Sequence, residues 1–272
     1  MFLRKFTIRK FAIRKTMSYH STLHQFNMNL RLFNTTYKEL CAQKHNIFIG
    51  ISVGVKPMSH DIALSYMEWA EKHSAGTIQI LIADEIAKFN YLVFSHSTTP
   101  GALSRAIRDG DKYQLFFEKI ITELPPARRT RFKVLRWKEI QTARFYTFLS
   151  KVVKDFESNI TFRDTILSFV DKYTENRNKL LTQEKKLLLC QYLLHELPTL
   201  LDGITVDGIN YNVILYPTYK HSGMSELVTE IQTGKKFISL ANSLDLKKTI
   251  MVEFLIKSVP PTTFPIDIMN SL

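Results

Sequence analysis

Short apolar runs alternate along the chain with longer segments in which apolar residues recur at helical spacing. The apolar runs predict four buried strands, at residues 46–55, 77–83, 132–137 and 208–216. The helical spacing predicts helices over residues 57–72, 102–123, 138–156, 162–180, 183–197 and 224–232, with a further helix shortly after residue 84. Strands that alternate with helices are typical of an α/β fold, here a Rossmann-like parallel sheet flanked by helices.

In such sheets the ligand crevice lies beyond the carboxyl ends of the strands. Ser52, Asp84 and Tyr216 each lie at the carboxyl end of a predicted strand. The predicted fold therefore brings three polar side chains towards one edge of the sheet, where chemistry is expected.

Neither an internal repeat nor a linker divides the sequence. We therefore predict a basic N-terminal tail over residues 1–40, followed by a single Rossmann-like domain over residues 41–272. Residues 1–15 contain six basic and no acidic side chains, which suits a flexible tail that helps to hold nucleic acid. A mitochondrial transit peptide is the alternative interpretation of this segment.

Composition narrows the class of protein. The chain has 272 residues, of which 45% are hydrophobic, so it can build a core and is neither disordered nor of low complexity. No apolar stretch approaches the roughly 18 residues of a membrane span. Two cysteines, Cys41 and Cys190, exclude a disulfide framework and a cysteine-rich zinc site and suit a reducing compartment.

The net charge of +12 is concentrated in two windows, residues 1–15 and residues 101–154. Localised basic patches favour a polyanionic partner. In the second window several side chains form one stripe of the predicted helix or a cluster just after it: Arg105, Arg108, Lys112, Lys119, Arg128 and Arg129. Such a stripe would contact phosphates without reading bases, although a solvated helix face is the alternative.

The segment Gly50-Ile51-Ser52-Val53-Gly54 matches the G-x-S-x-G pattern of a nucleophile elbow. A serine esterase is therefore one hypothesis for the function. Too few residues precede the serine for an α/β-hydrolase, and only Asp207 with His221 could complete a triad. Nucleotide-binding glycine motifs, the H-I-G-H and K-M-S-K-S signatures of synthetases and paired histidines are all missing from the sequence. We expect no cofactor and no metal.

Two further segments carry candidate chemistry. Tyr192 and Glu196 are four residues apart on a predicted helix, so a phenol and a carboxylate face the same way. Tyr216 ends the last predicted strand, and Pro217 terminates that strand. Each pattern taken alone is also common in ordinary cores.

Together, in this order and at these spacings, the G-x-S turn, the basic helix, the Tyr-x-x-x-Glu helix and the strand-end tyrosine resemble the tRNA-dependent cyclodipeptide synthases. The resemblance covers roughly residues 40–240. It is to the subfamily with proline after the tyrosine, as in Tyr216-Pro217, and Val55 replaces the asparagine of the other subfamily.

The resemblance implies a fold similar to the catalytic domain of class I aminoacyl-tRNA synthetases, without ATP chemistry. It implies that two aminoacyl-tRNAs are converted to a 2,5-diketopiperazine by ping-pong chemistry through an aminoacyl ester of Ser52. Tyr192 and Glu196 would hold the α-amino group, and Tyr216 would assist acyl transfer or cyclisation. The implied substrate pocket contains Phe48, Gly50, Ile51, Val55 and Pro217, and the tRNA contacts are the basic residues named above.

The partners expected are therefore aminoacyl-tRNAs, in the bacterial cytoplasm, with a monomer favoured. The sequence leaves a second class of function open, a tRNA- or RNA-binding protein without catalysis. Such a protein would keep the basic stripe and be indifferent to Ser52. The amino acids incorporated, and the group that activates Ser52, are not encoded in any pattern that we find.

Overall fold

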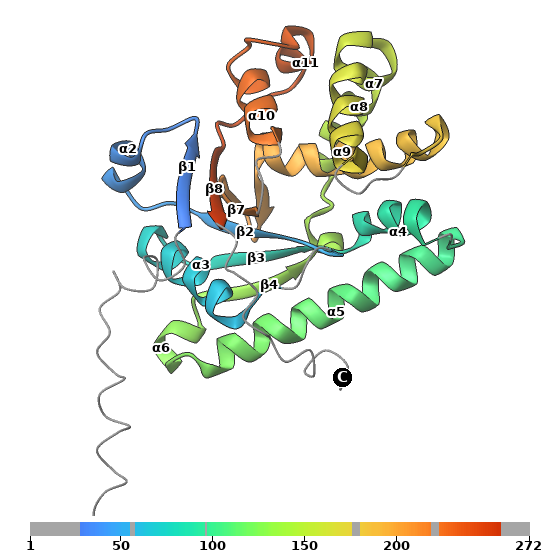
Figure 1. The fold of residues 1–272 in the computed structure, drawn as a ribbon. Helices are drawn as coiled ribbons and strands as arrows, with labels where there is room; N and C mark the ends of the chain where they lie inside the picture. The colour runs from blue at the N-terminus through green and yellow to red at the C-terminus, as the bar shows by residue number, and fades with distance from the viewer. Residues whose placement is uncertain (1–27, 55–57, 96, 176–179, 219–222, 257–272) are drawn as a thin grey trace, which may run out of the picture.

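The strands and helices of the computed structural model follow most of the predicted pattern (Figure 1). The structure describes residues 28–54, 58–95, 97–175, 180–218 and 223–256. The strands are β1 (Met28–Phe33), β2 (Ile47–Ser52), β3 (Ile78–Ala83), β4 (Phe132–Arg136), β5 (Ile204–Val206), β6 (Ile209–Tyr211), β7 (Val213–Thr218) and β8 (Ile250–Ile256). The helices are α2 (Tyr37–Ala42), α3 (His60–His73), α4 (Lys88–Phe94), α5 (Thr99–Glu123), α6 (Pro126–Arg129), α7 (Ala143–Ser158), α8 (Ile160–Glu175), α9 (Gln183–Asp202), α10 (Met224–Gln232) and α11 (Ile238–Ser243), with the 3-10 helices η2 (Glu85–Ala87) and η3 (Trp137–Ile140).

The main sheet has the strand order β1-β8-β7-β2-β3-β4. Strands β8, β7, β2, β3 and β4 are parallel, which confirms the predicted α/β fold with a parallel sheet flanked by helices. The chain runs from β2 outwards to β3 and β4 and then returns to β7 on the other side of β2. This reversal makes the gap between β2 and β7 a topological switch point, where ligands bind in open α/β sheets.

Side chains alternate along the strands into two cores, one on each face of the sheet. On β2, Ile47, Ile49 and Ile51 pack in the core that α3 and α5 cover, whereas Phe48 packs in the core that α7 to α10 cover (Figure 1). Every residue of β3 is buried, as expected for a strand covered on both faces. None of the described helices is long and apolar enough to cross a membrane.

Part of the segment predicted as a tail, residues 1–40, belongs to the main sheet. Strand β1 pairs antiparallel with β8, from Met28 opposite Ile256 to Phe33 opposite Met251. Leu40 is fully buried in the core that α3 and α5 cover. Strands β1 and β8 lie far apart in the sequence, so local patterns could not show that each provides the pairing edge for the other. Residues 1–27, with their basic cluster, lie outside the described residues.

The predicted strand over residues 208–216 is divided in two. Strand β6 pairs with β5 in a separate two-stranded sheet, and only β7 joins the main sheet. Asp207 and Gly208 form the turn between β5 and β6, with φ angles of 51° and 77° that suit a tight hairpin. The break at Asn212 lets the chain leave the hairpin and enter the sheet.

Helix α9 also differs from its prediction, because it continues through Pro198 to Asp202. A proline inside a helix removes one backbone hydrogen bond and usually ends the helix. Here Leu200 and Leu201, which are 3% and 0% exposed, hold the last turn against the core. The burial of these apolar side chains thus outweighs the tendency of Pro198 to end the helix.

Candidate active site

The candidate site opens where β2 and β7 separate. The two strands are paired only between Ile47–Ile49 and Val213–Leu215. Beyond this point the facing edges of β2 and β7 are unpaired, with Ser52 at the end of β2 and Tyr216 on β7, while β3 and β8 still pair with them on the outer sides. A Cβ atom at Gly50 would lie 3.7 Å from Cδ2 of Tyr216, so the tyrosine ring lies over the glycine. Because this stretch of β7 pairs only with β8, the missing N–H of Pro217 costs the sheet little.

Helix α9 completes the site from above the sheet (Figure 1). The hydroxyl of Tyr216 donates a hydrogen bond to Oε1 of Glu196, at 3.2 Å. The hydroxyl of Ser52 is a hydrogen-bonding neighbour of both Tyr192 and Tyr216. The structure thus brings the four candidate catalytic side chains together from β2, α9 and β7, at the switch point of the sheet.

A pocket with an empty volume of about 290 Å³ lies beside these groups. Most of its lining is apolar: Phe48, Gly50, Ile51, Ser52, Leu81, Ala83, Trp137, Glu196, Thr199, Leu200, Ile214 and Tyr216. Ile51 borders the pocket, although its side chain packs in the core of the opposite face. Strand alternation likewise sends Pro217 to the face opposite Tyr216. Val55 lies outside the described residues.

Glu196 is a buried carboxyl group, 5% exposed, without an ion-pair partner among the described residues. Burial raises its pKa from the usual 4.5 to about 7, while the hydrogen bond from Tyr216 acts in the opposite direction. The carboxyl group can therefore change its charge near neutral pH. A cationic group of a ligand would favour the ionised form.

The two phenols remain protonated at neutral pH. Burial raises the pKa values of both Tyr192 and Tyr216 well above their usual range, and the nearby charge of Glu196 raises them further. Both side chains are therefore hydrogen-bond donors and not bases for Ser52. No histidine is present among the described residues that line the pocket.

The basic stripe of α5 begins close to this site. Gly54, with φ of 84°, forms the turn after Ser52, and a Cβ atom there would lie 3.4 Å from the hydroxyl of Tyr91. Tyr91 donates to Oδ2 of Asp109 on α5, at 2.6 Å, and the guanidinium of Arg105 covers the Tyr91 ring at 4.6 Å. One chain of contacts thus joins the turn after the serine to the basic helix.

The cations of the stripe differ in their surroundings. Arg105 and Lys112 share Asp109, at 3.9 and 3.2 Å, and both remain exposed to solvent. Arg108 and Lys119 are exposed, and no ion pair to either is seen among the described residues. This face of α5 therefore retains an excess of positive charge.

Arg128 and Arg129 occupy a different environment, at the far end of α5. Arg128 forms an ion pair with Glu71 of α3 at 2.6 Å, and Arg129 donates to the carbonyl oxygen of Leu124 at 2.7 Å. Arg128 is half-buried in this contact. Its guanidinium joins α6 to α3 through this ion pair, and its contact with RNA stays a prediction.

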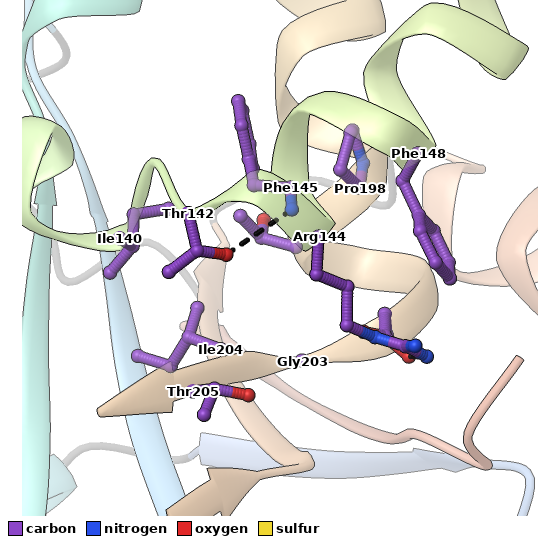
Figure 2. Close-up of a pocket in the computed structure, with 11 residues that line it drawn as sticks. Ile140, Thr142, Arg144, Phe145, Phe148, Pro198, Gly203, Ile204 and Thr205 are labelled. Atoms are coloured by element: carbon purple, nitrogen blue, oxygen red, sulfur yellow. Dashed lines mark hydrogen bonds and ion pairs between the residues drawn. The ribbon is translucent and has the colours of Figure 1, made fainter. Parts of the chain in front are cut away.

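A second pocket, of about 300 Å³, lies between α7, the end of α9 and β5 (Figure 2). Its charged groups neutralise each other, because Arg144 donates to both carboxylate oxygens of Asp202, at 2.5 and 2.7 Å. Figure 2 shows Phe148 beside Arg144, whose guanidinium lies 4.9 Å from the ring centre. No group of three or more potential metal ligands occurs among the described residues. The two charged side chains that line this pocket, Arg144 and Asp202, are therefore paired with each other.

The family model for cyclodipeptide synthases matches residues 29–234. The chain belongs to the cyclodipeptide synthase family. It is accordingly a tRNA-dependent enzyme that forms cyclodipeptides. Comparison with curated protein sequences finds no match.

Solved cyclodipeptide synthases have the same fold. A structure from Staphylococcus haemolyticus is 18% identical, with a TM-score of 0.63, and the match covers 85% of this chain and 100% of the other. One from Bacillus thermoamylovorans is 15% identical, with a TM-score of 0.65 and coverage of 87% and 99%. A tyrosyl-tRNA synthetase from Archaeoglobus fulgidus, 13% identical with a TM-score of 0.53, matches 88% of this chain and 65% of its own.

Several pocket residues of this cyclodipeptide synthase were not predicted from the sequence: Leu81, Ala83, Trp137, Thr199, Leu200 and Ile214. Alternation on β3 and β7 could have indicated Leu81, Ala83 and Ile214, because they share the sheet face of Phe48. Trp137 and Thr199 carry no such signal, since they enter the pocket from elements whose packing only the tertiary structure fixes. Asp84 was expected at this edge of the sheet; it follows the pocket-lining Ala83, and its carboxylate forms an ion pair with Arg136 at 2.6 Å.

Proposed function

We propose that this enzyme transfers the aminoacyl group of a first aminoacyl-tRNA to Oγ of Ser52 and joins it to a second one as a 2,5-diketopiperazine. The observation that carries the proposal is the meeting of Ser52, Tyr192, Glu196 and Tyr216 beside one apolar pocket at the switch point of the sheet.

In the first step Oγ of Ser52 attacks the ester carbonyl of the aminoacyl-tRNA. The bond to the ribose oxygen breaks, and the serine proton leaves with the released tRNA hydroxyl. One ester replaces another, so no ATP is required. Since both phenols are protonated donors, we assign the initial removal of the serine proton to the substrate's own amino group or ribose hydroxyl.

In the second step the neutral amine of another aminoacyl-tRNA attacks the seryl ester. This forms an amide, frees Ser52 and leaves a dipeptide esterified to tRNA. The amino group of the first residue then attacks the remaining ester, which closes the ring and releases the second tRNA. The protonated phenol of Tyr216 is suited to donate a hydrogen bond to the oxygen that becomes negative in these steps.

Glu196 would hold the α-ammonium group of the first residue with the help of Tyr192. An ammonium group beside a buried carboxyl group favours its ionised form. A carboxylate with a pKa near 7 can then accept the ammonium proton when the amine must become a nucleophile. A Glu196→Gln enzyme with full activity would contradict this role.

The RNA would be held by the exposed basic face of α5, through Arg105, Arg108, Lys112 and Lys119. Phosphate contacts position the substrate and leave the choice of amino acid to the pocket. The largely apolar lining, including Phe48, Leu81 and Ile214, favours an apolar side chain on the first amino acid.

The direct test is mass spectrometry of intact protein and small molecules after mixing the enzyme with a set of charged tRNAs. We expect a mass increase of one aminoacyl group on Ser52 and a cyclic dipeptide, both of which disappear in Ser52→Ala. Tyr146→Phe, which alters an exposed phenol on α7, is the matched control and should retain both products. Tight tRNA binding without adduct or product would identify a non-catalytic RNA-binding protein and overturn the mechanism.

A further inference from the structure

Asp84 is a buried carboxylate at the carboxyl end of β3 that the proposed chemistry does not use. It is 1% exposed and directly follows Ala83, which lines the substrate pocket. Arg136 donates to Oδ2 of Asp84 from Nε, at 2.8 Å, and from Nη2, at 2.6 Å. The backbone N–H of Trp137, a wall residue of the pocket, donates to the other oxygen at 3.1 Å. One carboxylate therefore holds both the arginine and the pocket wall.

The same guanidinium holds the basic helix. Nη1 of Arg136 donates to Asp111 at 2.6 Å and to Oε1 of Gln114 at 2.9 Å, and Nη2 donates to the carbonyl oxygen of Ile107 at 3.0 Å. All three acceptors belong to α5, which runs along one face of the sheet beside β3 and β4 (Figure 1). Arg136 thus links α5 to Asp84, and through Asp84 to the pocket.

Gly110 makes this approach possible. A Cβ atom at residue 110 would lie 2.6 Å from Cβ of Asp84 and 2.7 Å from Nη2 of Arg136, which is closer than real atoms come. Glycine is unfavourable inside a helix relative to alanine. Its presence in the middle of α5 is explained by this close contact with the ion pair.

We propose that Asp84, Arg136 and Gly110 are positioning residues that fix α5 against the substrate pocket, so that RNA phosphates held on the helix deliver the aminoacyl end to Ser52. The proposal rests on the proposed function. Gly110 lies between Arg105 and Lys112, so the contact anchors the very turns of α5 that carry the phosphate-binding charges. A misplacement of about 1 Å can slow an oriented reaction by about 100-fold, whereas mobile surface charges still attract a polyanion.

The test separates binding from transfer, with Gly110→Ala, Asp84→Asn and Arg136→Lys. Charged tRNA is mixed with excess enzyme, and the rate of aminoacylation of Ser52 is measured at saturation, beside the Kd for the same tRNA. We expect each variant to lower the single-turnover rate at least 10-fold and to change Kd less than 3-fold. Arg136→Lys keeps the charge but loses the planar fork that reaches α5, so it should resemble Asp84→Asn.

Glu71→Gln is the matched control, because it removes another largely buried ion pair, between α3 and Arg128, away from the pocket. At a comparable loss of Tm this variant should keep its transfer rate. The proposal is overturned if folded Asp84→Asn and Arg136→Lys transfer at the wild-type rate, if Kd rises in proportion to the loss of rate, or if Glu71→Gln loses as much. Absence of transfer in the wild-type enzyme would instead refute the proposed function.

Discussion

Individual residues of the site owe their properties to burial. Glu196 is a carboxyl group in an apolar setting, where its hydrogen bond with Tyr216 only partly offsets the loss of water. The same setting keeps Tyr192 and Tyr216 protonated. A helix spacing of four residues showed that Tyr192 and Glu196 face the same way, but it could not show that both are buried beside Ser52.

The titration of Glu196 makes stability depend on pH. Its pKa is raised from 4.5 to about 7 on folding, so the unfolded chain loses this proton first and the folded state loses stability as pH rises from about 4.5 to about 7. The contribution is up to about 3 kcal/mol. We expect Glu196→Gln to gain stability relative to wild type between pH 5 and pH 8, measured by urea unfolding at both values. Parallel pH dependence of the two proteins would contradict the assigned pKa.

Gly50 provides a test of the pocket that leaves the fold intact. A methyl group at this position meets only Cδ2 of Tyr216, at an ordinary contact distance of 3.7 Å, but it lies on the lining of the pocket. We expect Gly50→Ala to change the free energy of unfolding by less than about 1 kcal/mol and to lower cyclodipeptide formation at least 10-fold. Gly76→Ala, where a Cβ atom meets nothing within 4 Å, is the control and should leave both unchanged. Equal activity of the two variants would show that the pocket is not used.

Among the elements, α5 combines a buried face with a charged one. Ala102, Ala106 and Phe117 pack in the core, each at most 1% exposed, while the basic side chains project to solvent. The helix and its stripe were predictable from periodicity. The ion pair between Arg128 and Glu71 was not predictable from periodicity, because the two residues come into contact only in the folded chain.

The charges of α5 should govern salt dependence. We expect Arg105→Ala, Arg108→Ala and Lys112→Ala each to weaken tRNA binding and to reduce the slope of log Kd against log salt by about 1. Lys154→Ala removes an exposed cation from α7 and should leave the slope unchanged. The measurement is a titration of labelled tRNA at several salt concentrations. If the control and the α5 variants have the same slope, the RNA is bound elsewhere.

At the scale of the whole molecule, the sheet is closed at one edge by a strand from the beginning of the described chain. Strand β1 covers the edge of β8, and β8 in turn pairs with β7, which carries Tyr216. An uncovered edge of an apolar strand tends to pair with other molecules. The N-terminal segment therefore supports the site indirectly, through two layers of strand pairing.

Truncation tests this arrangement. A chain that starts at residue 28 keeps β1 and should remain folded. A chain that starts at residue 41 lacks β1 and the buried Leu40 and should aggregate or lose several kcal/mol of stability, on the order of 2–5 for the leucine alone. Soluble yield and urea unfolding compare the two. A stable chain that starts at residue 41 would show that β1 is dispensable.

The sequence by itself determined most of the central strands and helices, because periodic burial requires only neighbouring residues, but it did not indicate β1, β8, α2 or α11. It was sufficient for Ser52 at the end of β2, the Tyr192–Glu196 helix and the basic stripe, and hence for the family. The predicted strand end at Tyr216 is wrong, because β7 stays paired with β8 through Pro217 to Thr218. Tertiary structure decided what depends on contacts between distant segments: the pairing of β1 with β8, the separation of β2 from β7 that opens the crevice, and the burial that shifts the pKa of Glu196. It also made Asp84 a partner of Arg136, since only packing determines which charges meet.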